Sequence, residues 1–208
     1  STMWIKRAFD IAFSATALLL LAPLLAVIAL WVRRDSPGPV IYRQERVGRY
    51  GQLFRIYKFR TMRVGADAAG PQITVGADAR ITRAGQFLRR TKLDELPQFA
   101  NVLCGDMSVV GPRPEVPRYV ALYPTEVAAQ VLSVRPGITD LASLAYRDES
   151  EVLARSSDPE RAYVQEILPA KLQYACQYVR ERSLWLDLRI ISRTAAAVFS
   201  APADPQKP

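Results

Sequence analysis

The segment IAFSATALLLLAPLLAVIALWV, residues 11–32, has 22 residues and no charge, and twelve of them are Leu, Ile, Val or Phe. At 1.5 Å per residue, a helix of this length covers a hydrocarbon core of roughly 30 Å. The run exceeds the apolar region of a cleaved signal peptide, and few buried helices of water-soluble domains are as apolar. The segment therefore predicts a helix inserted in a membrane.

The residues around this segment leave two membrane topologies open. Lys6 and Arg7 precede it and Arg33 and Arg34 follow it, whereas the positive-inside rule expects basic residues on one side of the membrane. Pro23 divides it into half-helices of about 18 and 13 Å, and neither half spans a bilayer. A helix-break-helix hairpin that enters one leaflet and returns fits both features. A spanning helix with a proline kink is the alternative.

Composition limits the chemistry that the chain can perform. Its 208 residues contain no histidine, which excludes Ser-His and Cys-His nucleophile pairs, most zinc sites and imidazole as a base. Cys104 and Cys176 lie far apart in the sequence and have no metal-ligand or redox spacing. Any catalysis must therefore use carboxylates, Lys, Arg, Tyr or a bound metal.

The positive charge is concentrated in one region. Residues 33–63 contain nine Lys or Arg against two acidic residues, or +7 of the formal net charge of +8. A run of this kind is compatible with a solvated face, or with binding of anionic lipid, nucleic acid or a phosphorylated substrate. Within it, VIYRQERVG and LFRIYKFRTM predict two β-strands. Period-two alternation places Lys58 and Arg60 on one strand face, as solvated side chains or as a phosphate clamp.

The segment TKLDELPQFANVL, residues 91–103, contains the adjacent acids Asp94 and Glu95. A helix capped by Thr91 would place Pro97 in its second turn, at a cost of about 3 kcal/mol. A helix that starts near Leu96 avoids this cost, and the acids then precede its N-terminus. Such acids either complement the helix dipole or form a reactive site among the nearby cations. These cations are Arg89, Arg90 and Lys92.

Downstream segments predict one stiff turn and several capped helices. Pro112 and Pro114 enclose Arg113, so this guanidinium loses less conformational entropy when it meets an anion. Asp158 and Ser183 are predicted helix caps. The helix LWLDLRIISRTAAAVF is amphipathic, and it either packs against the core or lies in a membrane interface. Residues 1–34 are thus expected to form the membrane hairpin, 35–200 a catalytic domain and 201–208 a disordered tail.

Taken together, the basic-flanked apolar segment and the motifs YKFRTM, LRRTKLDELPQFANVLCGDMSVVGPRPE, RPGIT and SLWLDLRII resemble the bacterial sugar transferases known as monotopic phosphoglycosyl transferases. The resemblance covers residues 3–199. It implies a helix-rich α/β enzyme of the bacterial cytoplasmic membrane, with a re-entrant hairpin, interfacial amphipathic helices and a catalytic domain that faces the cytoplasm. It also implies transfer of a sugar 1-phosphate from a UDP-sugar to polyprenol phosphate, and no nucleic-acid partner.

The resemblance also implies roles for individual residues. Asp94 is expected to be the nucleophile and to take part in Mg²⁺ binding, with Glu95 beside it. Phosphate contacts are expected from Lys58, Arg60, Arg89 and Arg113, and a nucleotide-sugar contact from Arg147. Many relatives read PGITGWAQVNGR where this chain has PGITDLASLAYR, so the identity of the sugar stays open. The rival hypothesis is a membrane-anchored basic module that binds anionic lipid or nucleic acid without turnover.

Overall fold

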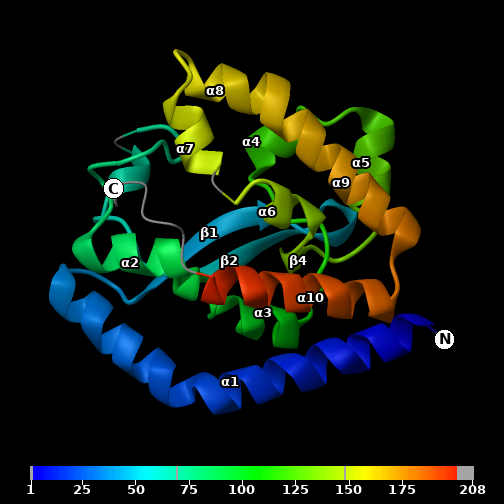
Figure 1. The fold of residues 1–208 in the computed structure, drawn as a ribbon, viewed down its shortest axis with the longest axis horizontal. Coiled ribbons are helices and arrows are strands. Elements are labelled where there is room, and N and C mark those ends of the chain that lie inside the picture. Colours follow the sequence, from blue (N-terminus) through cyan, green and yellow to red (C-terminus); the bar gives the residue numbers. More distant parts are fainter. Residues whose placement is uncertain (1, 69, 148, 201–208) are drawn as a thin grey trace.

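The computed structural model describes residues 2–68, 70–147 and 149–200. The predicted tail, 201–208, lies outside the described residues. The principal elements, shown in Figure 1, are α1 (Thr2–Asp35), β1 (Ile41–Val47), β2 (Leu53–Phe59), α2 (Arg83–Thr91), α3 (Gln98–Cys104), β3 (Ser108–Val110), α4 (Pro117–Val120), α5 (Thr125–Val131), β4 (Gly137–Thr139), α6 (Leu141–Ala145), α7 (Glu149–Ala154), α8 (Pro159–Ala162), α9 (Leu168–Glu181) and α10 (Leu184–Phe199). The predicted helix-rich fold with a small β component is confirmed, and the apolar N-terminal segment forms one long helix.

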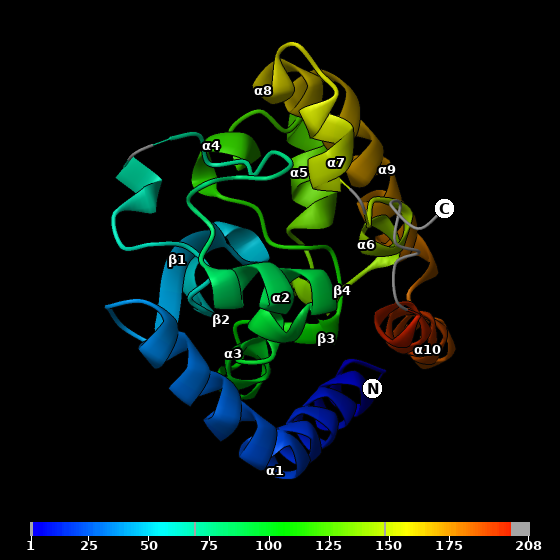
Figure 2. The same cartoon turned by 60° about the vertical axis from the view of Figure 1, so that its left-hand side comes forward.

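Helix α1 is continuous through Pro23, whereas the sequence leaves a helix-break-helix hairpin and a proline-kinked helix as alternatives. Pro23 lies inside it, and Figure 2 shows α1 bent into a wide V below the rest of the molecule. A proline removes one backbone hydrogen bond and pushes its ring against the preceding turn, which bends a helix without ending it. Among the described residues, α1 is the one helix long and apolar enough to cross a membrane, and little of its apolar window is buried.

Both ends of α1 are attached to the same body. Near the N-terminus, the Arg7 guanidinium donates to the Val102 carbonyl at 2.7 Å, at the end of α3. Near the C-terminus, Ile28 and Val32 are buried in an apolar cluster with Phe59 and Leu88. The middle of the helix is uncovered, with Leu19 and Leu20 more than 70% exposed. The bent apolar centre therefore projects away from a body that holds both ends.

Strands β1 and β2 form an antiparallel hairpin, which confirms the predicted strands. Their register pairs Ile41 with Phe59 and Val47 with Leu53. Phe54 and Ile56 alternate into a core that also contains Val102 of α3 and Ile190 of α10. Alternation ends with the strand at Phe59, so Arg60 does not continue the face that carries Lys58. The small β component is thus one hairpin plus a separate parallel pair, β3 and β4.

The β3–β4 pair brings the segment after β3 against the segment before β4. A Cβ atom added to Gly111 would lie 2.5 Å from the Arg135 carbonyl oxygen, and one on Gly137 would lie 2.0 Å from the Gly111 nitrogen. Any side chain at either position would collide with backbone. These glycines therefore permit the close approach that fixes the start of the Pro112–Arg113–Pro114 turn.

The predicted caps of the C-terminal helices are confirmed. Asp158 accepts a hydrogen bond from the Arg161 backbone N–H, and Ser183 accepts one from that of Leu186. Helix α10 turns Asp187 and Ile190 inward, whereas Trp185 is 70% exposed. The face of α10 that carries Trp185 therefore does not pack against the core.

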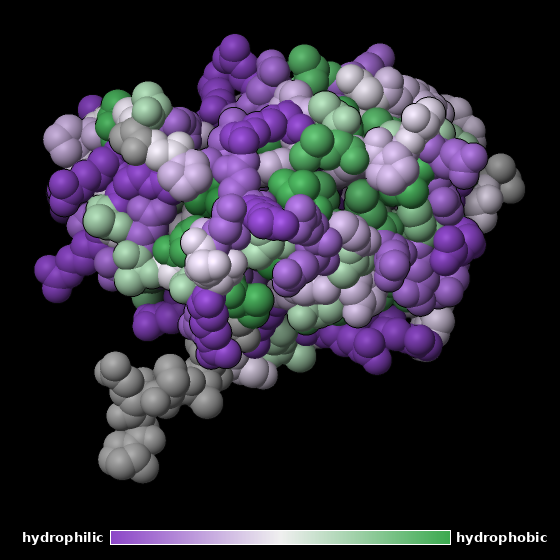
Figure 3. All heavy atoms as spheres, turned by 90° about the horizontal axis from the view of Figure 1, so that it is seen from above, coloured by the Kyte–Doolittle hydropathy of each residue, from purple (hydrophilic) through white to green (hydrophobic). Residues whose placement is uncertain are grey.

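The surface away from α1, seen in Figure 3, carries hydrophilic side chains across its whole extent, interspersed with smaller hydrophobic patches.

Candidate active site

The two adjacent acids lie in a single turn between α2 and α3. Lys92 ends α2 in the left-handed region at φ 62°, and residues Leu93–Glu95 form a 3₁₀ turn. Helix α3 begins at Gln98, so Pro97, which the sequence predicts as the first helical residue, occupies the N-cap position one residue earlier. A proline at this end of a helix loses no intrahelical hydrogen bond. The predicted placement of Asp94 and Glu95 immediately ahead of a helix is thus confirmed.

Glu95 is bound by two cations that come from different elements. Lys58 of β2 donates to Oε1 at 3.3 Å. The Arg113 guanidinium donates to both carboxylate oxygens, at 3.2 Å to Oε2 and in a shorter contact to Oε1. Burial by itself raises the pKa of Glu95, but the charges of Arg113 and Lys58 outweigh burial and hold this pKa well below its usual range. Glu95 is therefore ionised and holds both cations in place.

Asp94 has a different environment, although it is the preceding residue in the chain. Its side chain is buried, and its Oδ1 has no hydrogen-bond partner among the residues that the structure describes. Burial, followed by the charge of Glu95, raises the pKa of Asp94 to about 6, against the opposing effect of Lys58. An unpartnered buried carboxylate oxygen costs roughly 1–3 kcal/mol or more, and a protein retains such a group where a ligand satisfies it.

Arg113 is held through its backbone as well as its side chain. Its N–H donates to Asp140 Oδ2 at 3.3 Å. The same carboxylate caps α6, accepting from the Ser143 backbone N–H at 2.8 Å. Asp140 therefore supports both the start of α6 and the Pro112–Arg113–Pro114 turn, which we call the arginine turn.

The other predicted site residues divide into two groups. Arg89 lies close enough for the charge of Asp94 to raise its pKa, although burial has the larger effect and lowers it. Arg60 lies apart from the acids, at the end of α1, where its guanidinium donates to the backbone carbonyls of Ser36 and Pro39 at 2.8 and 2.6 Å. Arg147 donates to the Ser200 carbonyl at 3.1 Å. The structure thus brings Lys58, Arg89 and Arg113 to the acid pair, but not Arg60 or Arg147.

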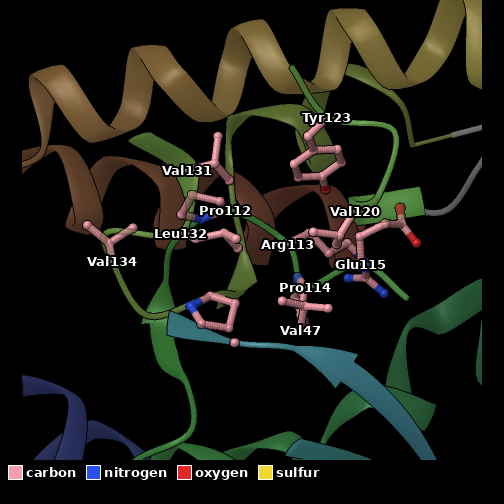
Figure 4. A pocket seen from close by; sticks show the side chains of 12 residues that line it. Val47, Pro112, Arg113, Pro114, Glu115, Val120, Tyr123, Val131, Leu132 and Val134 are labelled. Atoms are coloured by element: carbon pink, nitrogen blue, oxygen red, sulfur yellow. The ribbon is translucent and has the colours of Figure 1, made fainter. Parts of the chain in front are cut away.

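Residues that the sequence did not indicate support the site from behind. Arg46 donates to the Pro114 carbonyl at 2.8 Å, and Tyr163 donates to Glu115 in a short hydrogen bond. Figure 4 shows Arg113, Glu115 and Tyr123 on one side of an adjoining pocket and Val131 and Leu132 on the other. This cavity measures only about 10 Å³, which is room for one water molecule. This cavity therefore does not admit a ligand much larger than a water molecule.

The acid pair fits a magnesium ion, because Asp94 Oδ1 is buried and unpartnered among the described residues. That part of the chain contains no group of three or more Cys, Asp or Glu side chains placed to hold a metal by themselves. Mg²⁺ is commonly bound by one or two carboxylates together with substrate phosphates and waters. A single free carboxylate oxygen beside several cations is therefore compatible with a metal that binds together with a phosphorylated substrate.

Comparison with known proteins gives a consistent result. The sequence model of the family described as "Bacterial sugar transferase" matches residues 1–201. The chain is 40% identical over 198 residues to the UDP-glucose:undecaprenyl-phosphate glucose-1-phosphate transferase of Escherichia coli (strain K12). It is 37% identical over 199 residues to the UDP-N-acetylgalactosamine-undecaprenyl-phosphate N-acetylgalactosaminephosphotransferase of Aeromonas hydrophila.

These matches cover most of this chain but not most of each relative. They take in 94% and 95% of the chain, and 40% and 44% of the two transferases. The chain thus spans less than half the length of these relatives. The exopolysaccharide production protein PSS of Rhizobium leguminosarum bv. phaseoli is 42% identical over 199 residues, which is 93% of this chain and 94% of that protein.

Proposed function

The chain belongs to the bacterial sugar transferase family, and from this membership we propose that it transfers a sugar 1-phosphate from a UDP-sugar to undecaprenyl phosphate, with release of UMP. The names of its relatives combine these donor and acceptor classes. Their sugars are glucose and N-acetylgalactosamine, so the family match leaves the sugar open. The proposal places the protein at the first membrane step of bacterial glycan assembly.

One observation carries the proposed mechanism: Asp94 is a buried carboxylate with one oxygen that has no partner within residues 2–68, 70–147 and 149–200, while both oxygens of the adjacent Glu95 bind cations. A nucleophile must keep a lone pair free, and Asp94 Oδ1 does so. In the first half-reaction, this oxygen attacks the phosphorus bonded to the sugar. The bond from that phosphorus to the bridging oxygen breaks, and UMP leaves with the bond's electron pair. The sugar phosphate is then joined to Asp94 as an acyl phosphate.

The surrounding cations address the main difficulty of this step, since an anion approaches a diphosphate. Lys58 and Arg113 lie beside Glu95, and Arg89 of α2, which binds Thr74, is near enough for its charge to favour the ionised form of Asp94. Their charges lower the electrostatic cost in a site that is partly removed from water. The Asp94 carboxylate would also hold Mg²⁺, which when bound neutralises phosphate charge. The arginine turn and β2 thus orient the donor from two sides.

In the second half-reaction, the phosphate of the lipid acceptor attacks the phosphorus attached to Asp94. That phosphate is already ionised at neutral pH, so it needs no strong base. Asp94 leaves as a carboxylate and the lipid carries a diphosphate-linked sugar. The absence of histidine from the sequence is compatible with both halves, because neither requires an imidazole.

Helix α1 supports a proposed one-sided membrane topology. Its two ends bind the same body, and its uncovered apolar centre bends away from that body. We propose that the bent centre enters the cytoplasmic leaflet of the inner membrane and returns, with Trp185 of α10 at the interface. The catalytic domain then meets a UDP-sugar from the cytoplasm and a polyprenol phosphate from the bilayer.

Labelling of cysteines tests this topology. Thr2→Cys and Pro37→Cys are introduced separately into a variant without Cys104 and Cys176, and intact cells are treated with a membrane-impermeant thiol reagent. Neither position is expected to react until the inner membrane is permeabilised. Reaction of position 2 alone in intact cells contradicts the proposal and indicates a spanning helix.

The proposed activity is tested by measuring UMP release from a panel of UDP-sugars with Mg²⁺ and undecaprenyl phosphate. One or more sugars are expected to give sustained UMP release that requires all three components. The rival hypothesis of a basic binding module predicts salt-sensitive binding of anionic vesicles or nucleic acid with no turnover for any sugar. That result would overturn the proposed function.

A further inference from the structure

A buried ionic cluster lies outside the candidate site, where α1, β3, α9 and α10 meet. We call it the Lys6 junction, and it consists of Lys6, Asp10, Ser108, Tyr178 and Asp187. Lys6 donates to Asp187 Oδ2 at 2.5 Å and lies 3.4 Å from Asp10 Oδ1. Asp10 accepts from the Ser108 hydroxyl at 2.7 Å, and Tyr178 donates to Asp187 Oδ1 at 2.7 Å.

The burial of this cluster is costly and therefore informative. Asp10 and Asp187 are only 2% and 1% exposed, and one lysine serves both carboxylates. A buried ion pair is weak evidence for stability, because well-packed apolar residues often do as well or better. Such groups are more readily explained by a requirement for one defined arrangement of the elements that they join.

The arrangement that the junction defines centres on one backbone carbonyl. The Val110 oxygen accepts from Lys6 Nζ at 3.3 Å and lies 3.1 Å from the Tyr178 hydroxyl, which shares its one proton between this carbonyl and the nearer Asp187 Oδ1. Asp10 also binds the Val109 N–H at 3.2 Å. Side chains of α1 and α9 therefore bind the backbone at the end of β3 and hold it in place.

Val110 immediately precedes the segment that carries Arg113. Beyond it, Gly111 donates to the Thr139 carbonyl at 3.1 Å, and the Pro112 carbonyl accepts from the Gly137 N–H at 3.0 Å. Pro112 and Pro114 stiffen the backbone on either side of Arg113. Few freely rotating backbone bonds therefore separate the Val110 carbonyl from Arg113, whose guanidinium binds Glu95. A displacement of Val110 is thus passed along to Arg113.

We propose that the Lys6 junction positions Arg113 for phosphate binding and makes this position depend on the seating of α1 against β3 and α10. Tyr178, Asp187 and Lys6 are positioning residues, because they act through Arg113 and not on the substrate. The inference rests on the proposed function for its kinetic test, whereas its exchange test does not.

Tyr178→Phe is the sharpest variant, because it removes only the hydroxyl that binds Val110 and Asp187. In the full chain in lipid nanodiscs, kcat/KM for UMP release is expected to fall about fivefold, the effect of roughly one lost hydrogen bond. In an Arg113→Lys background, the same change is expected to lower kcat/KM by less than about twofold, since no fork remains to be positioned. Asp187→Asn, which weakens the link to Lys6, is expected to show the same dependence on Arg113.

Tyr119→Phe is the matched control. Tyr119 is equally buried, but its hydroxyl has no partner among the described residues and it packs in a different cluster. Its replacement is expected to leave kcat/KM unchanged. If Tyr178→Phe causes equal losses in the wild-type and Arg113→Lys backgrounds, or no loss in either, the positioning role is overturned.

Hydrogen exchange supplies a test that needs no activity. In Tyr178→Phe and Asp187→Asn, the amides of Gly111, Arg113, Glu115 and Val116, the non-proline residues of segment 111–116, are expected to exchange at least about tenfold faster, while those of the β1–β2 hairpin keep their wild-type rates. Unchanged exchange in 111–116 overturns the inference. If wild type releases no UMP from any donor, the proposed function fails and exchange alone decides the positioning role.

Discussion

Replacing Asp94 with asparagine is expected to abolish both covalent labelling of the protein and UMP release. The asparagine keeps the size of the side chain but removes the anionic oxygen that the structure leaves unpartnered. Wild-type protein incubated with Mg²⁺ and the correct UDP-sugar, without undecaprenyl phosphate, should release at most one UMP per molecule. Mass spectrometry should locate a sugar-phosphate adduct on the peptide that contains Asp94.

The pKa of Asp94 gives this reaction a pH dependence. Because burial and Glu95 raise that pKa to about 6 in the metal-free site, Asp94 is ionised at pH 7.5 and becomes protonated below pH 6, so the profile is measured at Mg²⁺ concentrations that leave this carboxylate largely unoccupied. The value of kcat/KM for adduct formation reports groups of the free enzyme. It should therefore fall by about tenfold per pH unit below 6. A profile that stays flat to pH 4.5 would argue against Asp94 as the group that must ionise.

Glu95→Gln tests the residue next to Asp94 in the same adduct assay. Glutamine can still meet one cation, but it leaves Lys58 and Arg113 without the charge that binds them together. Turnover should fall while the adduct stays on the Asp94 peptide. If instead the lipid phosphate attacks the donor directly, no adduct forms and no UMP appears until acceptor is added. That outcome would leave Asp94 as a metal ligand only.

The sequence predicts the local parts of this molecule well, because short-range forces determine them. Alternating residues give the β1–β2 hairpin, Ser183 caps α10, and Pro97 places the acids ahead of α3. These features depend on residues within a few positions of one another. The acid pair is therefore recognisable before its surroundings are known.

Long-range pairings were not predictable in the same way. Lys6 donates a hydrogen bond to Asp187, which lies 181 positions away in the sequence, and no local pattern indicates which acid is its partner. The same applies to Arg60. Its position two residues after Lys58 predicts that both side chains lie on one strand face, but its guanidinium binds backbone carbonyls just after the end of α1. Asp187 appears on the polar side of α10 by periodicity, yet it is buried because Lys6 and Tyr178 satisfy it. Charge type is visible in a sequence, whereas the partner of each charge depends on the packing.

The pairing between Arg113 and Glu95 depends on the shape of the cation as well as on its charge. Arginine offers a planar fork that meets both carboxylate oxygens, whereas lysine keeps the charge but presents a single ammonium group. The stiff turn and Glu95 together preorganise the guanidinium, so a donor phosphate can bind its other N–H groups with little further ordering. Arg113→Lys should therefore lower kcat/KM for UMP release at least about tenfold, or about 1.4 kcal/mol.

Arg118 supplies the matched comparison for this change. It also pairs with a glutamate, Glu160, but its side chain is 58% exposed and lies outside the candidate site. Exposed ion pairs contribute little, so Arg118→Lys should leave kcat/KM within about twofold of wild type. The ratio of the two effects separates fork geometry from charge. If lysine at position 113 works as well as arginine, Arg113 supplies only positive charge, and the preorganised phosphate clamp is wrong.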